Sequence, residues 1–366
     1  MTVVDQPVEQ PMDDALEAVG ELSNEVFKDL DIESWRSPAH SNEAVSDEHD
    51  RRLWRILADT GLLAAVLPET VGGGGTGVPG MVRLLTDAGA ALARLPLVET
   101  FVAALVVDEK NLPEVLSGEL VITAGLTEHP STLAAPLRLT GRRLNGITQL
   151  VPYPLSSDLV LVPALREDGK EVLALASLST ARIGDQVTTT GEPLGVLEFI
   201  DAEVMEISDA VGEARAYAAL FSSAMLCGIA ARALAMTAEY VGGRVQFGHP
   251  LATFQGVALR AADRYIDSRA MQAALWDAVH AIAAHGINSP RARYAIAAAK
   301  IWAADGARRV VGSAQHLHGG FGVDITYPLH RYHAWARYWE LYGGSAEAWS
   351  GDLGELISAY PIEEDE

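Results

Sequence analysis

The 366-residue chain has a single cysteine and only four lysines. Cys227 cannot form a disulfide within the chain and lies in an apolar stretch, so we expect it to be buried and inert. No apolar run approaches the roughly 20 residues of a membrane helix, which predicts no membrane insertion. The start at Met1 lacks a basic region followed by an apolar core, so we expect no signal peptide and a cytoplasmic protein.

Positively charged residues are also fewer than negatively charged ones, so the net charge is -22. Such an acidic chain is unsuited to nucleic acid and to anionic membranes, and we expect neither as a partner. Lysine is almost absent, so arginine must supply the local positive charge wherever the chain binds an anion.

Three regions of different character follow one another along the chain. Residues 1–118 show apolar residues at helical spacing and are predicted to form a helical domain. Residues 119–207 alternate short β-rich runs with turn pairs such as Asn145-Gly146, which is typical of a small β domain. Residues 208–366 contain long helical stretches with short Gly/Pro connectors, which indicates a four-helix bundle. The predicted fold class is therefore α+β and mostly α.

The first motif is Arg244-Val-Gln-Phe-Gly248, followed by Phe254-Gln255. An arginine suits a diphosphate because its planar guanidinium offers several donors to one anion. The alternative is a simple connector between two helices, with Arg244 solvated and Phe247 in the core.

The second motif is Gln315-His316-Leu-His-Gly319-Gly320. Glycine lets a backbone approach a ligand where a Cβ would block it. The pair could equally end a helix as a C-cap, and both interpretations can hold together. Two histidines at this spacing, with no cysteine or carboxylate pair nearby, do not make a zinc site, so we predict no metal.

Together with Tyr342-Gly343-Gly344-Ser345, these segments resemble the flavin-binding end of the acyl-CoA dehydrogenase family. The resemblance implies that family's fold, with an N-terminal helical domain, a middle β domain and a C-terminal four-helix bundle. It also implies FAD as cofactor, with Arg244 on the pyrophosphate and either Gln315 or His316 in a polar role. The cofactor-binding residues carried over are Arg244, Gln246, Phe247, Phe254, Gln255, Gln315, His316, Gly319 and Gly320, with Ser345 and Glu347 at the flavin edge and phosphates.

The family's catalytic carboxylate is missing. Members that this chain resembles have Tyr-Glu-Gly-Thr where Tyr342-Gly343 stands, and others have the base on the long helix at the position of Ala218. Glu213 lies more than one helical turn from Ala218, too far to replace it. We therefore predict no catalytic residue in this chain.

The segments that face the flavin ring in the family also depart from its pattern. Thr127-Glu128 resembles the start of a loop of that family but here lacks its Gly-Ser-Asp, and Leu150-Val-Pro152 stands in place of Trp-Ile-Thr. Proline has no backbone donor for a flavin contact. The ring half of the site is predicted to be degraded and the ADP half to be kept.

This asymmetry, taken with the resemblance, implies a non-catalytic subunit of an α2β2 acyl-CoA dehydrogenase, with a homologous catalytic partner supplying the base. Such heteromers are associated with actinobacterial steroid side-chain degradation, and the resemblance implies an acyl-CoA substrate and an electron-transfer flavoprotein as acceptor. Two alternatives stay open. One is a self-sufficient homo-oligomer with Glu340 or Glu347 as an unconventional base, and the other is a flavin-free scaffold.

Overall fold

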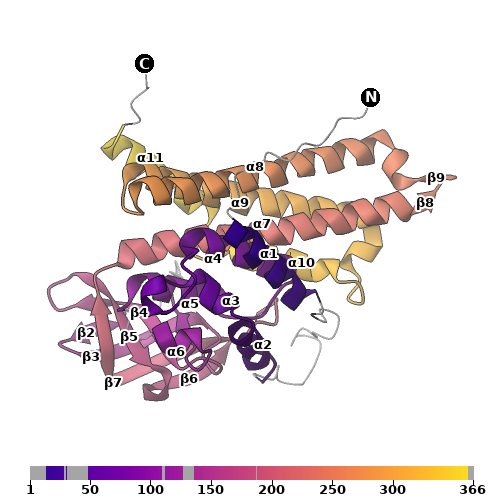
Figure 1. Ribbon diagram of the computed structural model, residues 1–366. Coiled ribbons are helices and arrows are strands. Elements are labelled where there is room, and N and C mark those ends of the chain that lie inside the picture. The colour runs from indigo at the N-terminus through magenta and orange to yellow at the C-terminus, as the bar shows by residue number, and fades with distance from the viewer. Residues whose placement is uncertain are drawn as a thin grey trace.

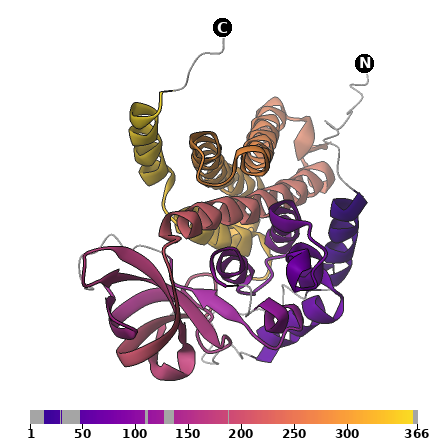
Figure 2. The same ribbon diagram turned by 60° about the vertical axis from the view of Figure 1, so that its left-hand side comes forward.

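The computed structural model describes residues 14–28, 30, 48–108, 112–126, 136–186 and 188–361. Helices come first, a β region follows, and long helices complete the chain (Figures 1 and 2). The mostly helical α+β fold class predicted from the sequence is therefore confirmed.

The N-terminal helices are short and pack beneath the bundle. Every residue of the helix over Leu97–Val106 except Leu105 is buried, which matches its almost continuous apolar sequence. The elements are α1 (Asp14–Phe27), α2 (Glu48–Asp59), α3 (Leu62–Val66), η3 (Glu69–Val71), α4 (Gly77–Ala90), α5 (Leu97–Val106) and α6 (Leu112–Leu116).

The β region closes on itself. The pairings β4–β2, β2–β3, β3–β7, β7–β5 and β5–β4 form a cycle, while β1 adds to β4 and β6 to β7. Alternate side chains such as Leu144, Val162 and Phe199 fill the interior as a core separate from that of the helices. The strands are β1 (Ile122–Ala124), β2 (Arg138–Thr140), β3 (Arg143–Pro152), β4 (Leu159–Arg166), β5 (Glu171–Ser177), β6 (Ala181–Gln186) and β7 (Leu194–Ser208), with η5 (Leu178–Thr180) between β5 and β6.

The C-terminal helices run back and forth along one long axis (Figure 1). The elements are α7 (Val211–Gly243), β8 (Val245–Gln246), β9 (His249–Pro250), η6 (Leu251–Thr253), α8 (Gln255–His285), α9 (Pro290–His318), η7 (Gly319–Val323), α10 (Leu329–Leu341) and α11 (Ala346–Ala359). At 33 residues, α7 is about 50 Å long and passes between the N-terminal helices and the other bundle helices.

α7 contacts α4 almost backbone to backbone. A Cβ at Gly228 would lie 1.9 Å from the Thr86 carbonyl oxygen, and one at Gly89 would lie 2.3 Å from that of Met225. By length and composition alone α7 could cross a membrane, so the expectation that no segment is apolar enough was wrong. However, 78% of its most apolar window is buried inside the fold, as in a core helix.

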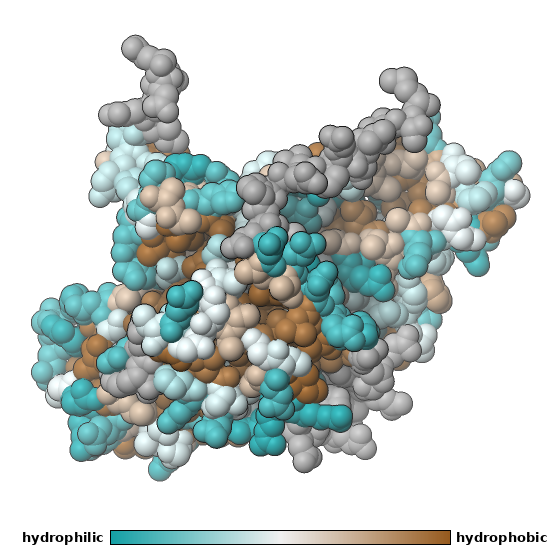
Figure 3. Space-filling view, in the orientation of Figure 1, coloured by the Kyte–Doolittle hydropathy of each residue, from teal (hydrophilic) through white to brown (hydrophobic). Residues whose placement is uncertain are grey.

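α8 is packed far less completely than α7. Only seven of its 31 residues are buried, and Leu259, Tyr265 and Ile266 are exposed. Figure 3 shows hydrophobic residues on the surface of the upper bundle, whereas polar residues cover much of the β region. The bundle therefore keeps exposed apolar residues along α8.

Candidate functional site

The Arg244 motif forms a hairpin between α7 and α8. β8 and β9 pair through Val245 with Pro250 and Gln246 with His249. Phe247 and Gly248 form the turn with φ of 55° and 84°, as a two-residue hairpin turn requires. A bulky aromatic residue is strained in this left-handed conformation, since its Cβ crowds the following carbonyl.

The Phe247 side chain is 91% exposed, so the interpretation that it lies in the core was wrong. Its ring meets that of Phe254 edge to face, with centroids 6.3 Å apart. Arg244, Gln246 and Gln255 are exposed beside them, and Gln255 begins α8. The hairpin thus presents a guanidinium, two amides and two aromatic rings at the right-hand end of the bundle in Figure 1.

The second motif ends α9 and begins η7. Gly319 has φ 60° and ψ -139°, a conformation that essentially only glycine adopts, and it is also the C-cap of α9. A Cβ on Gly319 or Gly320 would meet no atom within 4 Å. The chain's own packing therefore does not require glycine at position 320, and the space above the pair is open. His316 is exposed there, whereas Gln315 is half-buried.

The two motifs lie at the same end of the bundle. Tyr240, in the last turn of α7, stacks on His318 at the end of α9, with ring centroids 4.2 Å apart. The Tyr240 hydroxyl also donates to the His318 carbonyl oxygen at 3.4 Å. We call the candidate contact residues of these two motifs the ADP-end set, comprising Arg244, Gln246, Phe247, Phe254, Gln255, Gln315, His316, Gly319 and Gly320.

The two positions that hold a base in the resembling family also meet, but at a different place. A Cβ built on Gly343 would lie 3.7 Å from the Ala218 Cβ. Neither residue carries a proton-transferring group. Glu213 is occupied elsewhere, since its carboxylate accepts a hydrogen bond from the Asn288 amide at 2.6 Å.

The turn around Gly343 is held from two sides. The buried Lys300 ammonium donates to the carbonyl oxygens of Trp339 at 2.9 Å and Tyr342 at 2.8 Å. From α11, the Trp349 indole donates to the Gly343 carbonyl oxygen at 2.8 Å. Burial lowers the pKa of Lys300 to about 7, while the nearby Glu340 opposes that shift.

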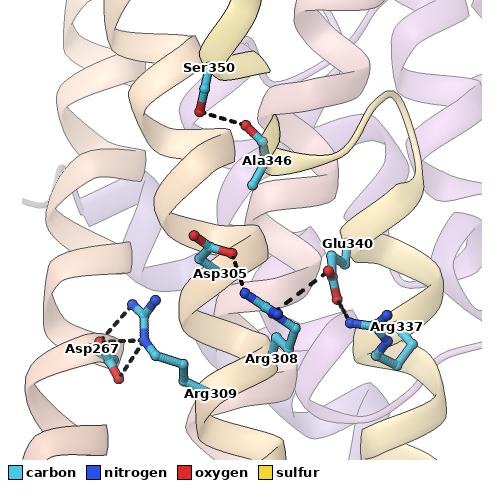
Figure 4. Close-up of polar contacts among 8 residues, drawn as sticks. All are labelled: Asp267, Asp305, Arg308, Arg309, Arg337, Glu340, Ala346 and Ser350. Carbon is cyan, nitrogen blue, oxygen red and sulfur yellow. Dashed lines mark hydrogen bonds and ion pairs between the residues drawn. The ribbon is translucent and has the colours of Figure 1, made fainter. Parts of the chain in front are cut away.

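Of the two acids proposed as unconventional bases, Glu340 is engaged on another face of α10. Its carboxylate points toward Arg308 and Arg337 (Figure 4), with Arg308 Nε 3.9 Å from Oε1. Glu347 is exposed in the first turn of α11, and Ser345 is the N-cap of that helix, accepting from the Ala348 N–H at 3.3 Å.

A buried acid near Gly343 was missed from the sequence. Glu99 in α5 is fully buried, and neither carboxyl oxygen receives a hydrogen bond of standard geometry. Burial raises its pKa to about 8, the charge of Glu192 adds to the shift, and hydrogen bonding from its own backbone and from Tyr342 opposes it. One signal was available, a lone glutamate in the apolar run around Leu97–Val106.

The ADP-end set and the Gly343 turn are too far apart to serve one ligand. Ala218 lies on α7 and Arg244 is the C-cap of the same helix, 26 residues further on, which corresponds to about 39 Å at 1.5 Å rise per residue. A single FAD molecule cannot span that distance. The ADP-end set and the Gly343 turn are therefore two separate places on this chain.

Two backbone groups of the β-region segment Leu150–Pro152 are already bonded within the chain. The Leu150 N–H donates to Gln186 Oε1 at 2.9 Å, and the Pro152 carbonyl oxygen accepts from the Thr123 hydroxyl at 2.6 Å. Pro152 itself has no N–H. Thr127-Glu128 lies outside the described residues.

This architecture, a helical layer, a closed β region and an antiparallel bundle with hairpin and glycine motifs at one end, defines an acyl-CoA dehydrogenase fold. The family model for the acyl-CoA dehydrogenase C-terminal domain matches residues 211–355. The acyl-CoA dehydrogenase FadE27 of Mycobacterium tuberculosis is 32% identical over 356 residues, covering 91% of this chain and 95% of that protein. The chain belongs to the acyl-CoA dehydrogenase family.

Two solved structures are also similar to this chain in fold. A variant of the steroid ACAD Tcur3481-Tcur3483 has a TM-score of 0.85 and 31% identity, covering 94% of this chain and 98% of that one. The ChsE4-ChsE5 complex from Mycobacterium tuberculosis has a TM-score of 0.84 and 27% identity, covering 96% and 99%. Each of these two names joins two proteins, Tcur3481 with Tcur3483 and ChsE4 with ChsE5.

Proposed function

We propose that this chain is the non-catalytic subunit of a heteromeric, FAD-dependent acyl-CoA dehydrogenase. The observation that carries the proposal is the contrast between two places along α7. At the C-terminal end of α7, Arg244 and the open Gly319-Gly320 pair are exposed. Near its N-terminal end, Gly343 and Ala218 occupy the two positions at which other members of the family have their catalytic base.

The ADP-end set fits one end of FAD. Arg244 would bind the pyrophosphate, because its fork offers parallel donors to a diphosphate. The open space at Gly319 and Gly320 would let the backbone approach the dinucleotide, and Phe247 and Gln255 would contact its adenosine end. The strained, solvent-exposed Phe247 gains a binding partner in this arrangement.

The ring-facing segments of this chain do not fit the isoalloxazine. Leu150 N–H is bonded to Gln186, Pro152 has no donor, and no acid stands at position 343 or 218. A homologous partner subunit would therefore supply the ring pocket and the base. The paired proteins named in the two structural relatives support such a partner, and so does the apolar surface of α8.

The proposed reaction is α,β-dehydrogenation of an acyl-CoA thioester. When bound, FAD would supply the acceptor for the hydride of the β-carbon, and the partner's carboxylate would remove the α-proton. The steroid ACAD among the structural relatives makes a steroid side-chain CoA ester our proposed substrate. An α2β2 assembly and an electron-transfer flavoprotein as acceptor complete the proposal.

The test is the FAD content of this chain expressed alone and co-expressed with a homologous subunit that has an intact base. We expect flavin only in the complex, at about one per pair of chains. Stoichiometric flavin with turnover in the lone chain would refute the partner role, and a complex without flavin would favour a scaffold.

A matched pair of variants separates cofactor binding from general surface effects. Arg244→Ala should weaken FAD binding to the complex at least tenfold and so lower its flavin occupancy, because a charge-assisted contact to an anion contributes on the order of 1.5–3 kcal/mol. Arg182→Ala, which removes an arginine on β6 with a 75% exposed side chain, should leave occupancy unchanged. Equal occupancy in both variants would contradict the assignment of Arg244.

A further inference from the structure

His318 is buried directly before the glycine pair and belongs to none of the exposed contacts described so far. Its side chain is the last of α9, and only 3% of the residue is exposed. Nδ1 lies 2.8 Å from the Ala314 carbonyl oxygen, and Nε2 lies 3.3 Å from the Tyr327 hydroxyl.

These contacts assign the protonation of the ring. A carbonyl oxygen can only accept, so Nδ1 carries the proton and donates to Ala314. Nε2 is then the acceptor for the Tyr327 hydroxyl. Burial lowers the pKa of His318, in keeping with a neutral ring, although the Ala314 contact opposes that shift. The imidazole thus joins α9 to the segment that follows η7.

His318 belongs to a cluster of four rings that come from α7, α9, η7 and the segment after η7. Tyr240 of α7 stacks on His318 at 4.2 Å and 20°, and lies parallel to Phe321 at 5.8 Å. Phe321 in turn packs against Tyr327 at 4.4 Å. We call these four residues, Tyr240, His318, Phe321 and Tyr327, the aromatic box.

The aromatic box contacts the backbone that leads into Gly319, since the Tyr240 hydroxyl donates to the His318 carbonyl oxygen. That glycine has φ 60° and ψ -139°, so its peptide groups point in directions that an unrestrained helix end would not keep. Two residues after Gly320, Gly322 is packed so tightly that a Cβ would lie 2.7 Å from the Gln315 carbonyl oxygen. The box and this contact fix both ends of the Gly319-Gly320 segment.

We propose that His318 is a positioning residue for the ADP end of the flavin. It acts through Gly319 and Gly320 and does not itself touch the cofactor. The inference rests on the proposed function, because it assumes that these glycines face a bound dinucleotide. The inference adds that the affinity of the Gly319-Gly320 segment for the dinucleotide depends on the two hydrogen bonds of the neutral His318 imidazole.

The test uses the co-expressed complex stripped of flavin. His318→Phe keeps an aromatic ring but removes both hydrogen bonds, whereas Tyr327→Phe removes only the donor to Nε2. His280→Phe is the control, since His280 is an exposed histidine of α8 that also lies beside an aromatic ring, Trp276. We measure the dissociation constant of FAD, the inhibition constant of ADP against FAD rebinding, and the melting temperature of the apo complex.

We expect His318→Phe to weaken FAD about tenfold and ADP by the same factor, Tyr327→Phe to weaken both about threefold, and His280→Phe to change neither. The apo complex should keep its subunit ratio, and its melting temperature should stay within about 2 °C of the wild-type value. Unchanged FAD and ADP constants would overturn the inference, as would a loss of affinity that merely follows a loss of apo stability. A wild-type complex without flavin would instead refute the proposed function.

Discussion

Replacing Glu99 by glutamine tests the buried acid beneath the Gly343 turn. The carboxyl group is fully buried, and its pKa is raised from 4.5 to about 8, mainly by burial. In the unfolded chain it is ionised at neutral pH, whereas in the folded protein it must take up a proton. Stability from this group is therefore full below pH 4.5 and is lost as the pH rises toward 8.

The magnitude follows from the two pKa values. At about pH 5.5 the proton uptake costs the wild type about 1.4 kcal/mol relative to a permanently neutral side chain, and at about pH 8 it costs about 4 kcal/mol. Glutamine has nearly the same shape and is neutral at every pH, but its buried amide hydrogens cost about 1–3 kcal/mol. We expect the stability of Glu99→Gln relative to the wild type to rise by about 3 kcal/mol between these two pH values.

The assay is urea denaturation of both proteins at the two pH values, each purified in the same oligomeric form. The control is Glu114→Gln, which changes an exposed glutamate of α6 and should shift stability equally at both pH values. A stability difference for Glu99→Gln that stays constant with pH would refute the reasoning, because Glu99 would then be no harder to ionise in the folded protein.

Three further changes have defined outcomes. Lys300→Met leaves the carbonyl oxygens of Trp339 and Tyr342 without their donor. Although burying the ammonium is itself costly, this change should lower the free energy of unfolding by about 2–4 kcal/mol. Urea denaturation measures this value, and an unchanged free energy of unfolding would contradict the prediction. Gly343→Glu should give the lone chain no activity, because φ of 69° costs a non-glycine residue about 1–2 kcal/mol and the Leu150 N–H is already bonded to Gln186. Turnover of any acyl-CoA by this variant would show the reasoning wrong. Phe247→Asn should slightly raise the melting temperature of the apo complex, since asparagine tolerates the left-handed turn. It should also lower the affinity of the complex for FAD, measured by titration. A rise in FAD affinity would argue against a flavin contact at this residue.

The ADP-end set could be proposed from the sequence because its motifs are local. Arg244 to Gln255 fold as one hairpin and helix start, and the glycine pair ends a helix where its composition predicts an end. The spacing of residues within each motif carries the geometry. What the spacing could not show is the conformational role of each residue, such as the left-handed turn that leaves Phe247 91% exposed.

Contacts between distant segments were not predictable in the same way. Glu99 in the N-terminal helices meets Tyr342 near the end of the chain, and Leu150 is 36 residues from Gln186. Such pairs depend on how the β region and the bundle pack, for which no local pattern exists. Glu99 is buried, whereas glutamate is usually exposed. Its position in an apolar run could have identified it as a buried acid.

The separation along α7 decides what a homodimer of this chain could do. Two copies could place the exposed ADP-end set of one against the Gly343 end of the other. At that end, however, the Leu150 N–H is held by Gln186, the Gly343 carbonyl oxygen is held by Trp349, and positions 343 and 218 carry no acid. In the proposed arrangement, every site in a homodimer would combine the ADP-end set of one copy with a Gly343 end that has no acid at position 343 or 218. In our proposal, a partner with an acid at the position of Gly343 or Ala218 would complete the site, and we therefore expect the lone chain to be inactive.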